Sequence, residues 1–392
     1  MNISVVGQGY VGLPLAIAAS SAGHTVFGID SDPNQVSYIS NGRSPIEDLS
    51  DQQISNALGT GRYTVTLNFD SIHKADIVII CVPTPLDESR KPDFSYLVSA
   101  LKSIAPNLKA GALVINESTV SPGTTRDLIA SVLNQANTPY ELAYSPERID
   151  PANKDWTITN TPKLVSGLTP QATERAANFY RSFVSTVTTG YSPEVIEAAK
   201  LLENSFRLIN ISFINEFAEF CEAMEIDVRE VISAASTKPY GFMPFYPGAG
   251  IGGHCIPVDP SYLVAKAREI GAATKFIDLA NEINAARSSH FVNMAEKKLK
   301  NLSGKKIILV GVAYKANVAD IRETPAAPIL ENLRSRNAQV SWHDDLVREW
   351  RGEKSTPLNN NFDLAILINP HASTDLSLLG TVPRIDTRGA KP

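Results

Sequence analysis

Residues 3–30 read ISVVGQGYVGLPLAIAASSAGHTVFGID, and they predict the architecture of the N-terminal part of the chain. An apolar strand runs into the glycine motif of residues 7–12, an apolar helix follows, and a second strand ends at Asp30. A strand, G-x-G-x-x-G, a helix, a strand and then an acid about twenty residues after the motif form the Rossmann pattern. The sequence therefore predicts an α/β dinucleotide-binding domain in this part of the chain.

The glycine motif predicts how a dinucleotide would bind. Gly7 permits the tight turn, Gly9 lets the pyrophosphate reach the helix N-terminus, and Gly12 allows the helix to pack closely on the strand. The carboxylate of Asp30 would accept hydrogen bonds from a ribose hydroxyl and disfavours the additional phosphate of NADP, so NAD is the predicted cofactor. The predicted contacts of this motif are Gly7, Gly9, Tyr10, Val11, Gly12 and Asp30.

Three later apolar strands each run into a loop rich in Pro, Ser and Thr. These loops hold residues 83–85, 117–125 and 145–148. Ligands of an open α/β sheet bind beyond the carboxyl ends of its strands, so these loops are predicted to line the nicotinamide and the substrate. Plain turns are the alternative, because Pro, Gly and Ser are also turn residues. The predicted cofactor contacts in these loops are Pro83, Thr84 and Thr119.

A long helix is predicted in the middle of the chain. Ser192 can cap its start, Pro193 suits the first helical position, and apolar residues then recur at helical spacing to about residue 226. A helix of roughly thirty residues is long enough to bridge two domains. Lys200 and Asn204 lie four residues apart and share one face of it. On spacing alone, Lys200 is more readily interpreted as a solvated surface lysine.

A glycine-rich loop after this helix holds the most reactive candidate of the chain. It reads GIGGHCIPVDP over residues 250–260, with Cys255 near its centre and Asp259 four residues later. A thiolate can attack a carbonyl, and a neighbouring carboxylate can direct water or protons. The alternative is a buried structural cysteine. The preceding residues 237–249 are rich in Pro, Gly and aromatic residues, which indicates either a ligand surface or a hydrophobic plug between domains.

The C-terminal part of the chain predicts a second Rossmann-like unit. Within residues 305–313, lysines lead into an apolar strand that is followed by Gly311, but the G-x-G-x-x-G motif is absent. Such a domain could bind a different nucleotide ligand, whose phosphates Lys315 and Arg322 could neutralise. The alternative for both residues is a surface charge in a loop. Further strands are predicted at residues 339–342, 362–368 and 384–388.

The 392 residues are expected to form three domains, over residues 1–188, 189–300 and 301–392. A net charge of −5 without a basic stripe argues against a nucleic-acid partner. No apolar run approaches the length of a membrane span, and Met1 leads directly into the first strand without room for a signal peptide. The cysteines, whose spacing suits neither a disulfide framework nor a zinc site, are Cys81, Cys221 and Cys255. We therefore expect no metal site and a reducing cytoplasm as the location.

Seven motifs, in order, resemble those of the nucleotide-sugar 6-dehydrogenase family, which comprises UDP-glucose, UDP-N-acetylmannosamine and UDP-N-acetylglucosamine dehydrogenases. The motifs are GQGYVGLPLA, CVPTPL, ESTVSPGTT, SPER, EAAKLLENSFRLINISFINE, GGHCIPVDP and YKANVADIRETPA. The resemblance covers essentially the whole chain. It implies oxidation of a sugar C6 alcohol to a carboxylate with two NAD⁺, and a UDP-sugar-binding C-terminal domain. It also implies a homodimer or higher homo-oligomer formed through the long helix.

The resemblance implies roles for individual residues. Cys255 would trap the aldehyde as a thiohemiacetal, which a second hydride transfer converts to a thioester. Lys200 and Asn204 would stabilise the oxyanion, since fixed donors act strongly in a water-poor site. The implied catalytic residues are Cys255, Lys200, Asn204, Asp259, Glu147 and Thr119.

The remaining implied roles concern water, protons and binding. Asp259, with Thr119, would place the water that hydrolyses the thioester, and Glu147 would serve as general acid or base. Lys315 would contact the sugar nucleotide, and Arg322 would contact NAD from the far side of the cleft. The implied substrate contacts are Glu147, Arg148, Lys200, Asn204, Phe245, Tyr246, Gly248, Gly252 and Lys315.

The loop around Cys255 also indicates a branch of the family. Glucose-type enzymes usually carry GGSCFPKD, whereas this chain has His254 and Val258. These residues and the loop KPYGFMPFYPG of residues 238–248 resemble the N-acetylhexosamine branch, most closely the UDP-N-acetylglucosamine 6-dehydrogenases. UDP-N-acetylglucosamine is therefore the first expected substrate, before its mannosamine or galactosamine epimers and UDP-glucose.

Two segments depart from the pattern of this branch. Residues 150–153 read DPAN where Pro-Gly often follows SPER, and residues 369–371 read NPH where a motif with threonine is common.

Two other functions remain open: a nucleotide-sugar binding protein without activity, and a dehydrogenase that performs one oxidation and releases an aldehyde. The presence of Cys255 argues against both, because neither function needs a nucleophilic cysteine.

Overall fold

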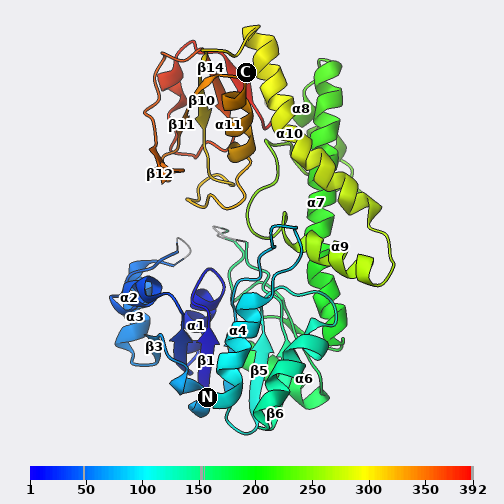
Figure 1. The fold of residues 1–392 in the computed structure, drawn as a ribbon. Coiled ribbons are helices and arrows are strands. Elements are labelled where there is room, and N and C mark those ends of the chain that lie inside the picture. The colour runs from blue at the N-terminus through cyan, green and yellow to red at the C-terminus, as the bar shows by residue number, and fades with distance from the viewer. Residues whose placement is uncertain (47–48, 151–152, 154, 390–392) are drawn as a thin grey trace. The chain divides into compact units, whose positions relative to one another are not determined.

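The computed structural model describes residues 1–46, 49–150, 153 and 155–389 (Figure 1). Residues 151 and 152 of the DPAN segment lie outside this description. The chain divides into two compact units. The first unit contains Met1–Leu202 and Ser261–Gly271, and the second contains Glu203–Pro260 and Ala272–Pro392.

The first unit is built on a doubly wound sheet. Among the described residues its strand order is β3-β2-β1-β4-β5-β6-β8, parallel throughout except for the antiparallel pair β6–β8. The chain reverses its direction of growth between β1 and β4, and such a reversal opens a crevice for ligands at the carboxyl ends of the strands. A short parallel pair joins β7 to β9. The strands are β1 (Asn2–Val6), β2 (Thr25–Ile29), β3 (Tyr63–Thr66), β4 (Ile77–Ile80), β5 (Ala112–Asn116), β6 (Tyr140–Tyr144), β7 (Lys163–Leu164), β8 (Ser166–Gly167) and β9 (Val187–Thr188).

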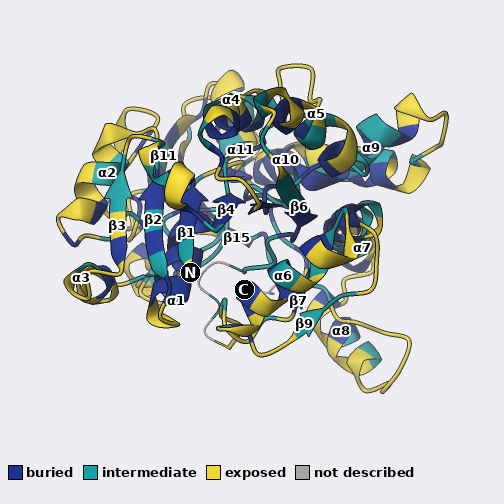
Figure 2. Cartoon of the chain, turned by 90° about the horizontal axis from the view of Figure 1, so that it is seen from below, coloured by how far each residue is buried: buried dark blue, intermediate teal, exposed yellow. Residues whose placement is uncertain are grey.

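Helices cover both faces of this sheet, because successive strand residues point to opposite sides. Val5 packs into one hydrophobic core with Leu13 of the first helix, whereas Val6 packs into a second core with Leu97. Figure 2 shows the buried strands beside helices whose outer faces are exposed. The helices of this unit that precede residue 192 are α1 (Gly12–Ser21), α2 (Pro33–Ser40), α3 (Asp51–Gly59), α4 (Ser95–Ile104), α5 (Ala130–Leu133) and α6 (Pro170–Arg181), with short helical turns at Asp70–Lys74, Ala105–Asn107, Thr125–Ile129 and Asn134–Ala136.

The long helix is α7 (Pro193–Ala223), 31 residues in length. The Ser192 hydroxyl caps it by accepting a hydrogen bond from the backbone N–H of Val195 at 3.4 Å, as the sequence predicts. Three further helices follow, namely α8 (Val228–Ser236), α9 (Asp259–Glu269) and α10 (Lys275–Leu299). None of the described helices is both long and apolar enough to cross a membrane.

The second unit contains a parallel sheet with the order β11-β10-β14-β15 among its described strands. Helices α10 and α11 pack on one face of it, where Phe291 and Ile329 join the strand residue Leu309 in one hydrophobic core. The elements are β10 (Lys306–Val310), α11 (Ala326–Ser335), β11 (Gln339–His343), the hairpin β12 (Glu349–Trp350) and β13 (Glu353–Lys354), β14 (Leu364–Leu367), a helical turn at Leu376–Leu379, and β15 (Arg384–Asp386). The predicted fold class is confirmed: an N-terminal Rossmann sheet, a helical middle segment and a C-terminal Rossmann-like sheet. The domain boundaries at residues 188 and 300 stay a prediction.

Candidate active site

The glycine motif forms the cradle that a dinucleotide requires. Gly7 has a φ of +92°, and a Cβ there would lie 2.5 Å from the carbonyl oxygen of Cys81. A Cβ at Gly9 would meet no heavy atom within 4 Å, so the space above this turn is open to a pyrophosphate. Asp30 accepts a hydrogen bond from the backbone N–H of Gln8 at 2.7 Å, which holds its carboxylate against the motif. The geometry of these residues therefore fits NAD, the cofactor that the glycine motif and Asp30 predict.

The loops beyond β4 and β5 are held by hydrogen bonds that the sequence does not reveal. The Tyr262 hydroxyl donates to the carbonyl oxygen of Thr84 at 2.6 Å, and the Ser118 hydroxyl donates to that of Val82 at 2.7 Å. Thr84 is buried, whereas Thr119 is half-buried. Tyr262 lies far along the chain from the loop it fixes, so only the folded structure identifies it as a support of the predicted cofactor site.

Glu147 and Lys200 form an ion pair within the first unit. Their carboxylate oxygen and ammonium nitrogen lie 3.5 Å apart, and both side chains are almost fully buried. Burial raises the pKa of Glu147, and the positive charges of Lys200 and Lys163 oppose that rise. The interpretation of Lys200 as a solvated surface lysine is therefore wrong. A buried carboxyl with a raised pKa is the kind of group that can exchange a proton near neutral pH.

A second buried ion pair lies in the same electrostatic environment. The Lys163 ammonium lies 2.6 Å from the carboxylate of Glu117, and the Tyr180 hydroxyl donates to the same carboxylate. Glu117 raises the pKa of Glu147 while Lys163 lowers it, so the two ion pairs influence each other. No sequence pattern indicates Lys163 or the role of Glu117, since the two residues lie 46 positions apart and neither belongs to a recognisable catalytic spacing.

In the second unit, Asn204 and Asp259 are joined directly. The Asn204 amide donates to the Asp259 carboxylate at 2.6 Å, and both side chains are buried. The backbone N–H of Asp259 donates to the carbonyl oxygen of Cys255 at 2.8 Å, so the loop turns tightly between these residues. Cys255 is half-buried and does not form a disulfide.

The glycines before Cys255 are required by close packing. A Cβ at Gly252 would lie 2.7 Å from the carbonyl oxygen of Glu323, and one at Gly253 would lie 2.8 Å from the ring of Tyr314. The backbone N–H of Gly253 donates to the carbonyl oxygen of Arg322 at 3.0 Å. The cysteine loop therefore rests on residues 314–325, which join β10 to α11 in the same unit.

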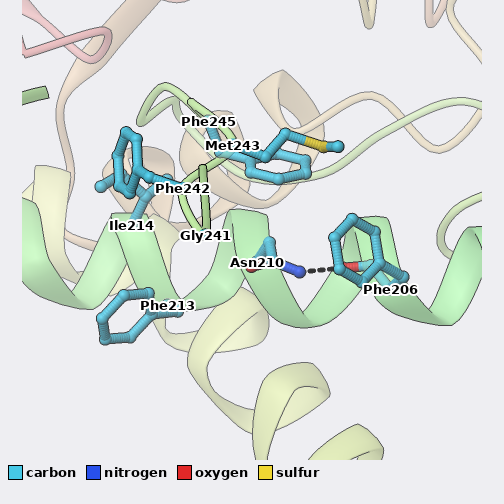
Figure 3. A pocket seen from close by; sticks show the side chains of 8 residues that line it. All are labelled: Phe206, Asn210, Phe213, Ile214, Gly241, Phe242, Met243 and Phe245. Atoms are coloured by element: carbon cyan, nitrogen blue, oxygen red, sulfur yellow. Dashed lines mark hydrogen bonds between the residues drawn. The ribbon is translucent and has the colours of Figure 1, made fainter. Parts of the chain in front are cut away.

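The aromatic loop before the glycines packs against the part of α7 that lies in the second unit. The rings of Phe206 and Phe245 meet edge to face at 5.9 Å between centroids, beside an apolar groove of about 420 Å³. Gly248 is anchored by the side chains of Asn215 and Arg287. Figure 3 shows the lining of the groove, which consists of Phe206, Asn210, Phe213, Ile214, Gly241, Phe242, Met243 and Phe245. Tyr246 remains 58% exposed.

The predicted charged contacts differ in their surroundings. Arg148 donates to the carbonyl oxygen of Pro162 at 2.8 Å, and Arg322 forms a bidentate pair with Asp320 of its own loop. Lys315 is half-buried in the loop beyond β10. The structure thus brings Glu147 to Lys200 and Asn204 to Asp259, in separate units. Their roles, and those of the other predicted residues, stay predictions. The described residues contain no cluster of side chains that could hold a metal ion.

Three family models match the chain in succession. The NAD binding domain of the UDP-glucose/GDP-mannose dehydrogenase family matches residues 1–184, and the central domain of that family matches residues 194–286. Its UDP binding domain matches residues 308–375. Together these ranges span most of the chain.

Individual relatives agree with these matches. The chain is 35% identical over 389 residues to a UDP-N-acetyl-D-glucosamine 6-dehydrogenase of Pseudomonas aeruginosa, covering 95% of this chain and 91% of the relative. It is 34% identical over 350 residues to a UDP-N-acetyl-D-mannosamine dehydrogenase of Methanococcus maripaludis, covering 88% and 79%. The solved structure of a UDP-D-ManNAc dehydrogenase from Pyrococcus horikoshii superposes with a TM-score of 0.91 at 31% identity, covering 99% of this chain and 95% of that chain. The chain belongs to the UDP-glucose/GDP-mannose dehydrogenase family and is an NAD-dependent nucleotide-sugar dehydrogenase.

Proposed function

We propose that the protein oxidises the C6 alcohol of a UDP-N-acetylhexosamine to the uronic acid in two steps. The observation that carries this proposal is the Cys255 loop: a cysteine that forms no disulfide lies in a tightly packed glycine loop, one turn before Asp259, which is hydrogen-bonded to Asn204. An enzyme that only oxidises an alcohol to an aldehyde needs no such nucleophile. The overall reaction consumes one water and two NAD⁺, and it yields a carboxylate, two NADH and three protons.

In the first oxidation, Glu147 is proposed to accept the proton of the C6 hydroxyl. Its raised pKa suits this role, because a base of higher pKa binds the proton more strongly. The neighbouring Lys200 ammonium, together with Asn204, would stabilise the negative charge that develops on the substrate oxygen. NAD accepts the hydride that leaves C6 in each oxidation.

The second oxidation is proposed to run through Cys255. Its thiolate forms a C–S bond to the aldehyde carbon, and the carbonyl oxygen takes up a proton to give a thiohemiacetal. Loss of a hydride from that carbon and of the hydroxyl proton then gives a thioester. Water, placed by Asp259 and Thr119, attacks the thioester carbon, which breaks the C–S bond and releases the carboxylate and the thiol.

Among the UDP-hexosamines, we propose UDP-N-acetylglucosamine as the substrate. The 35% identity to a protein named for this activity supports the choice, and the HCIPVD sequence around Cys255 resembles the same branch. Lys315 and the loop that contains Phe245, Tyr246 and Gly248 are proposed to bind the sugar nucleotide. The product would serve the synthesis of a surface polysaccharide. Cysteines that form no disulfide and the use of NAD are consistent with a cytoplasmic location.

The yield of NADH per sugar tests the proposed function. Purified protein with excess NAD⁺ and limiting UDP-N-acetylglucosamine is expected to produce about two NADH per sugar, because each oxidation releases one hydride. The mannosamine and galactosamine epimers and UDP-glucose should react more slowly under the same conditions. A yield of one NADH per sugar would contradict the double oxidation, and no NADH with any of the four would contradict the substrate class.

We also propose that the protein forms a homodimer through α7. Phe206, Phe213 and Phe220 recur at intervals of seven residues on this helix, and each is about half exposed. Apolar side chains at this spacing form one stripe along a helix, which is typical of a surface that pairs with another helix. A second copy of the chain carries the same stripe and would bury it symmetrically.

Replacing Phe213 with Asp is expected to convert the dimer to the 42.4 kDa monomer, because a carboxylate would be buried in the apolar interface. Light scattering coupled to size exclusion measures the change in mass. The matched control is Phe276→Asp, which alters an exposed phenylalanine on α10 and should leave the mass unaltered. A wild-type protein that elutes as a monomer would contradict the proposal.

A further inference from the structure

Three loops of the C-terminal sheet are tied together at His371. His371 is buried, with 5% of the residue exposed, and it lies just after β14. The backbone N–H of Asn317, in the loop after β10, donates to His371 Nδ1 at 2.7 Å. On the other side of the ring, His371 Nε2 lies 2.7 Å from the carboxylate of Asp344, just after β11. Because Nδ1 accepts a hydrogen bond, the proton of the neutral ring belongs on Nε2, which donates to Asp344.

Asp344 stands where Asp30 stands in the N-terminal sheet, but its carboxylate is differently engaged. Asp30 accepts from the backbone N–H of Gln8 after β1, and Asp344 accepts from those of Val312 and Ala313 after β10. Asp344 also accepts from the backbone N–H groups of the loop that follows it, as well as from His371. Its carboxylate is buried and saturated, so it serves the structure of the loops and has no capacity left to bind a ribose.

The loop after β10 is held at two further points by the segment after β14. The Asn369 amide donates to the carbonyl oxygens of Ala313 and Tyr314, both at 3.0 Å. The Asn317 side chain accepts from the backbone N–H of Ala372 at 2.9 Å. Asn317 has a φ of +65°, a left-handed conformation that asparagine adopts more readily than most other non-glycine residues.

This loop reaches two parts of the candidate site within the second unit. It carries Lys315, two residues before Asn317. It also carries Tyr314, whose ring packs against Gly253 and fills the space that a Cβ at Gly253 would need. Gly253 lies two residues before Cys255. The geometry of residues 314–317 therefore affects both the proposed substrate contact and the support of the cysteine loop.

We propose that His371 is a positioning residue for the substrate site. It acts through the backbone N–H of Asn317, and it holds the loop of residues 314–317 so that Lys315 is presented to the sugar nucleotide and Tyr314 supports Gly253. The inference rests on the proposed function, because Lys315 is assigned there to the sugar nucleotide. The proposal also explains the NPH sequence of residues 369–371, which departs from the common motif. Asn369 and His371 of this sequence both form hydrogen bonds with the loop after β10.

Two substitutions of His371 separate its two hydrogen bonds. In His371→Asn, the amide oxygen can take the place of Nδ1 and still accept from Asn317. In His371→Gln, the amide nitrogen can take the place of Nε2 and still donate to Asp344, but the acceptor for Asn317 is lost. The matched control is His343→Gln, since His343 lies at the end of the neighbouring strand β11 and contacts Thr356 and Asp345 instead.

The kinetic constants of the three variants, measured with NAD⁺ and UDP-N-acetylglucosamine, test the proposal. We expect His371→Gln to raise KM for the nucleotide sugar by about tenfold or more and to leave KM for NAD within about twofold. The NAD binding domain is the N-terminal one, and Arg322, the further predicted NAD contact, is held by Asp320 and not by His371. His371→Asn is expected to raise the first constant by no more than about threefold, and His343→Gln should resemble the wild type. Equal effects of the Gln and Asn variants at His371, or a parallel rise in KM for NAD, would overturn the proposal.

Amide hydrogen exchange provides a measurement that needs no substrate. Residues 314–318 are expected to exchange faster in His371→Gln than in the wild type, with His371→Asn close to the wild type. If the wild type oxidises no UDP-sugar, the proposed function fails, and this comparison still decides whether His371 holds the loop. Exchange at residues 314–318 that is the same in His371→Gln and the wild type would refute the inference by itself.

Discussion

Replacing Cys255 with Ser is expected to lower the rate of uronic acid formation by on the order of 10³-fold or more. A serine hydroxyl has almost the same size as the thiol, but it is a far weaker nucleophile at neutral pH, so neither thiohemiacetal nor thioester forms at a useful rate. The variant should still bind NAD and the nucleotide sugar. Mass spectrometry of the products, with the NADH yield measured in parallel, distinguishes loss of acid from loss of all oxidation.

The matched control for Cys255→Ser is Cys221→Ala. Cys221 is buried in a small apolar core with Ile214, Val228 and Ile232, so its removal should affect stability slightly and acid formation little. Acid formation by Cys255→Ser at the wild-type rate would show that the covalent stage is absent. In that case the protein would perform the second oxidation without a nucleophilic cysteine.

The need for a cysteine follows from the chemistry of the second oxidation. A free aldehyde carbon holds no alkoxide that could expel a hydride, whereas a thiohemiacetal restores a hydroxyl on that carbon. The close packing of Gly252 and Gly253 fixes the loop that would perform this step, and fixed geometry is a large part of catalytic rate enhancement. The hydrogen bond from Asn204 orients Asp259 one turn beyond Cys255.

Local sequence patterns predict much of this structure, because they depend on neighbours in the chain. The strand–glycine–helix pattern of residues 3–30 matches β1, α1 and β2 closely, and the predicted cap at Ser192 is confirmed. The pairing of Asn204 with Asp259 could not be predicted, since 55 residues separate them. The motifs that contain Asn204 and Asp259 identify each residue as a candidate, but they do not indicate the contact between the two.

The buried polar groups that support the site could not be predicted either, because their partners also lie far apart along the chain. Lys163 is the first residue of the two-residue strand β7, and only the fold shows that its ammonium group is buried with Glu117. His371 and Asp344 approach each other only once β11 and β14 flank β10. A single sequence gives no periodicity or spacing for such pairs, because their separation along the chain is set by the lengths of the intervening helices and loops.

Replacing Lys163 with Met is expected to lower the free energy of unfolding by about 3–5 kcal/mol. The side chains of Lys163 and Glu117 are 10% and 1% exposed, so the substitution leaves a buried carboxylate with Tyr180 but without its cation. Urea denaturation measures the loss. The matched control is Lys109→Met, which breaks an ion pair of the same 2.6 Å length with Asp76, but with side chains that are 46% and 36% exposed. That exposed pair is expected to contribute about 1 kcal/mol or less.

The double substitution Lys163→Met with Glu117→Gln identifies the origin of the loss. If the unpaired carboxylate causes it, Gln at position 117 removes the charge and should restore most of the stability, although each single change is destabilising. A double variant as unstable as the sum of the single ones would indicate lost packing instead.

The single substitution Lys163→Met should also change the pKa of Glu147. Lys163 lowers the pKa of Glu147, so its removal raises that pKa further, and activity that needs the carboxylate form of Glu147 should then rise at a higher pH than in the wild type. The sign for stability agrees: burial raises the pKa of Glu147 in the folded protein, so its charged form destabilises the fold, and this penalty builds up as pH rises from the ordinary pKa of a glutamate to the raised pKa. The deficit of Lys163→Met should therefore be larger at a pH above the raised pKa of Glu147 than at a pH below the ordinary pKa of a glutamate, and an equal deficit at both would show that Lys163 does not act on Glu147.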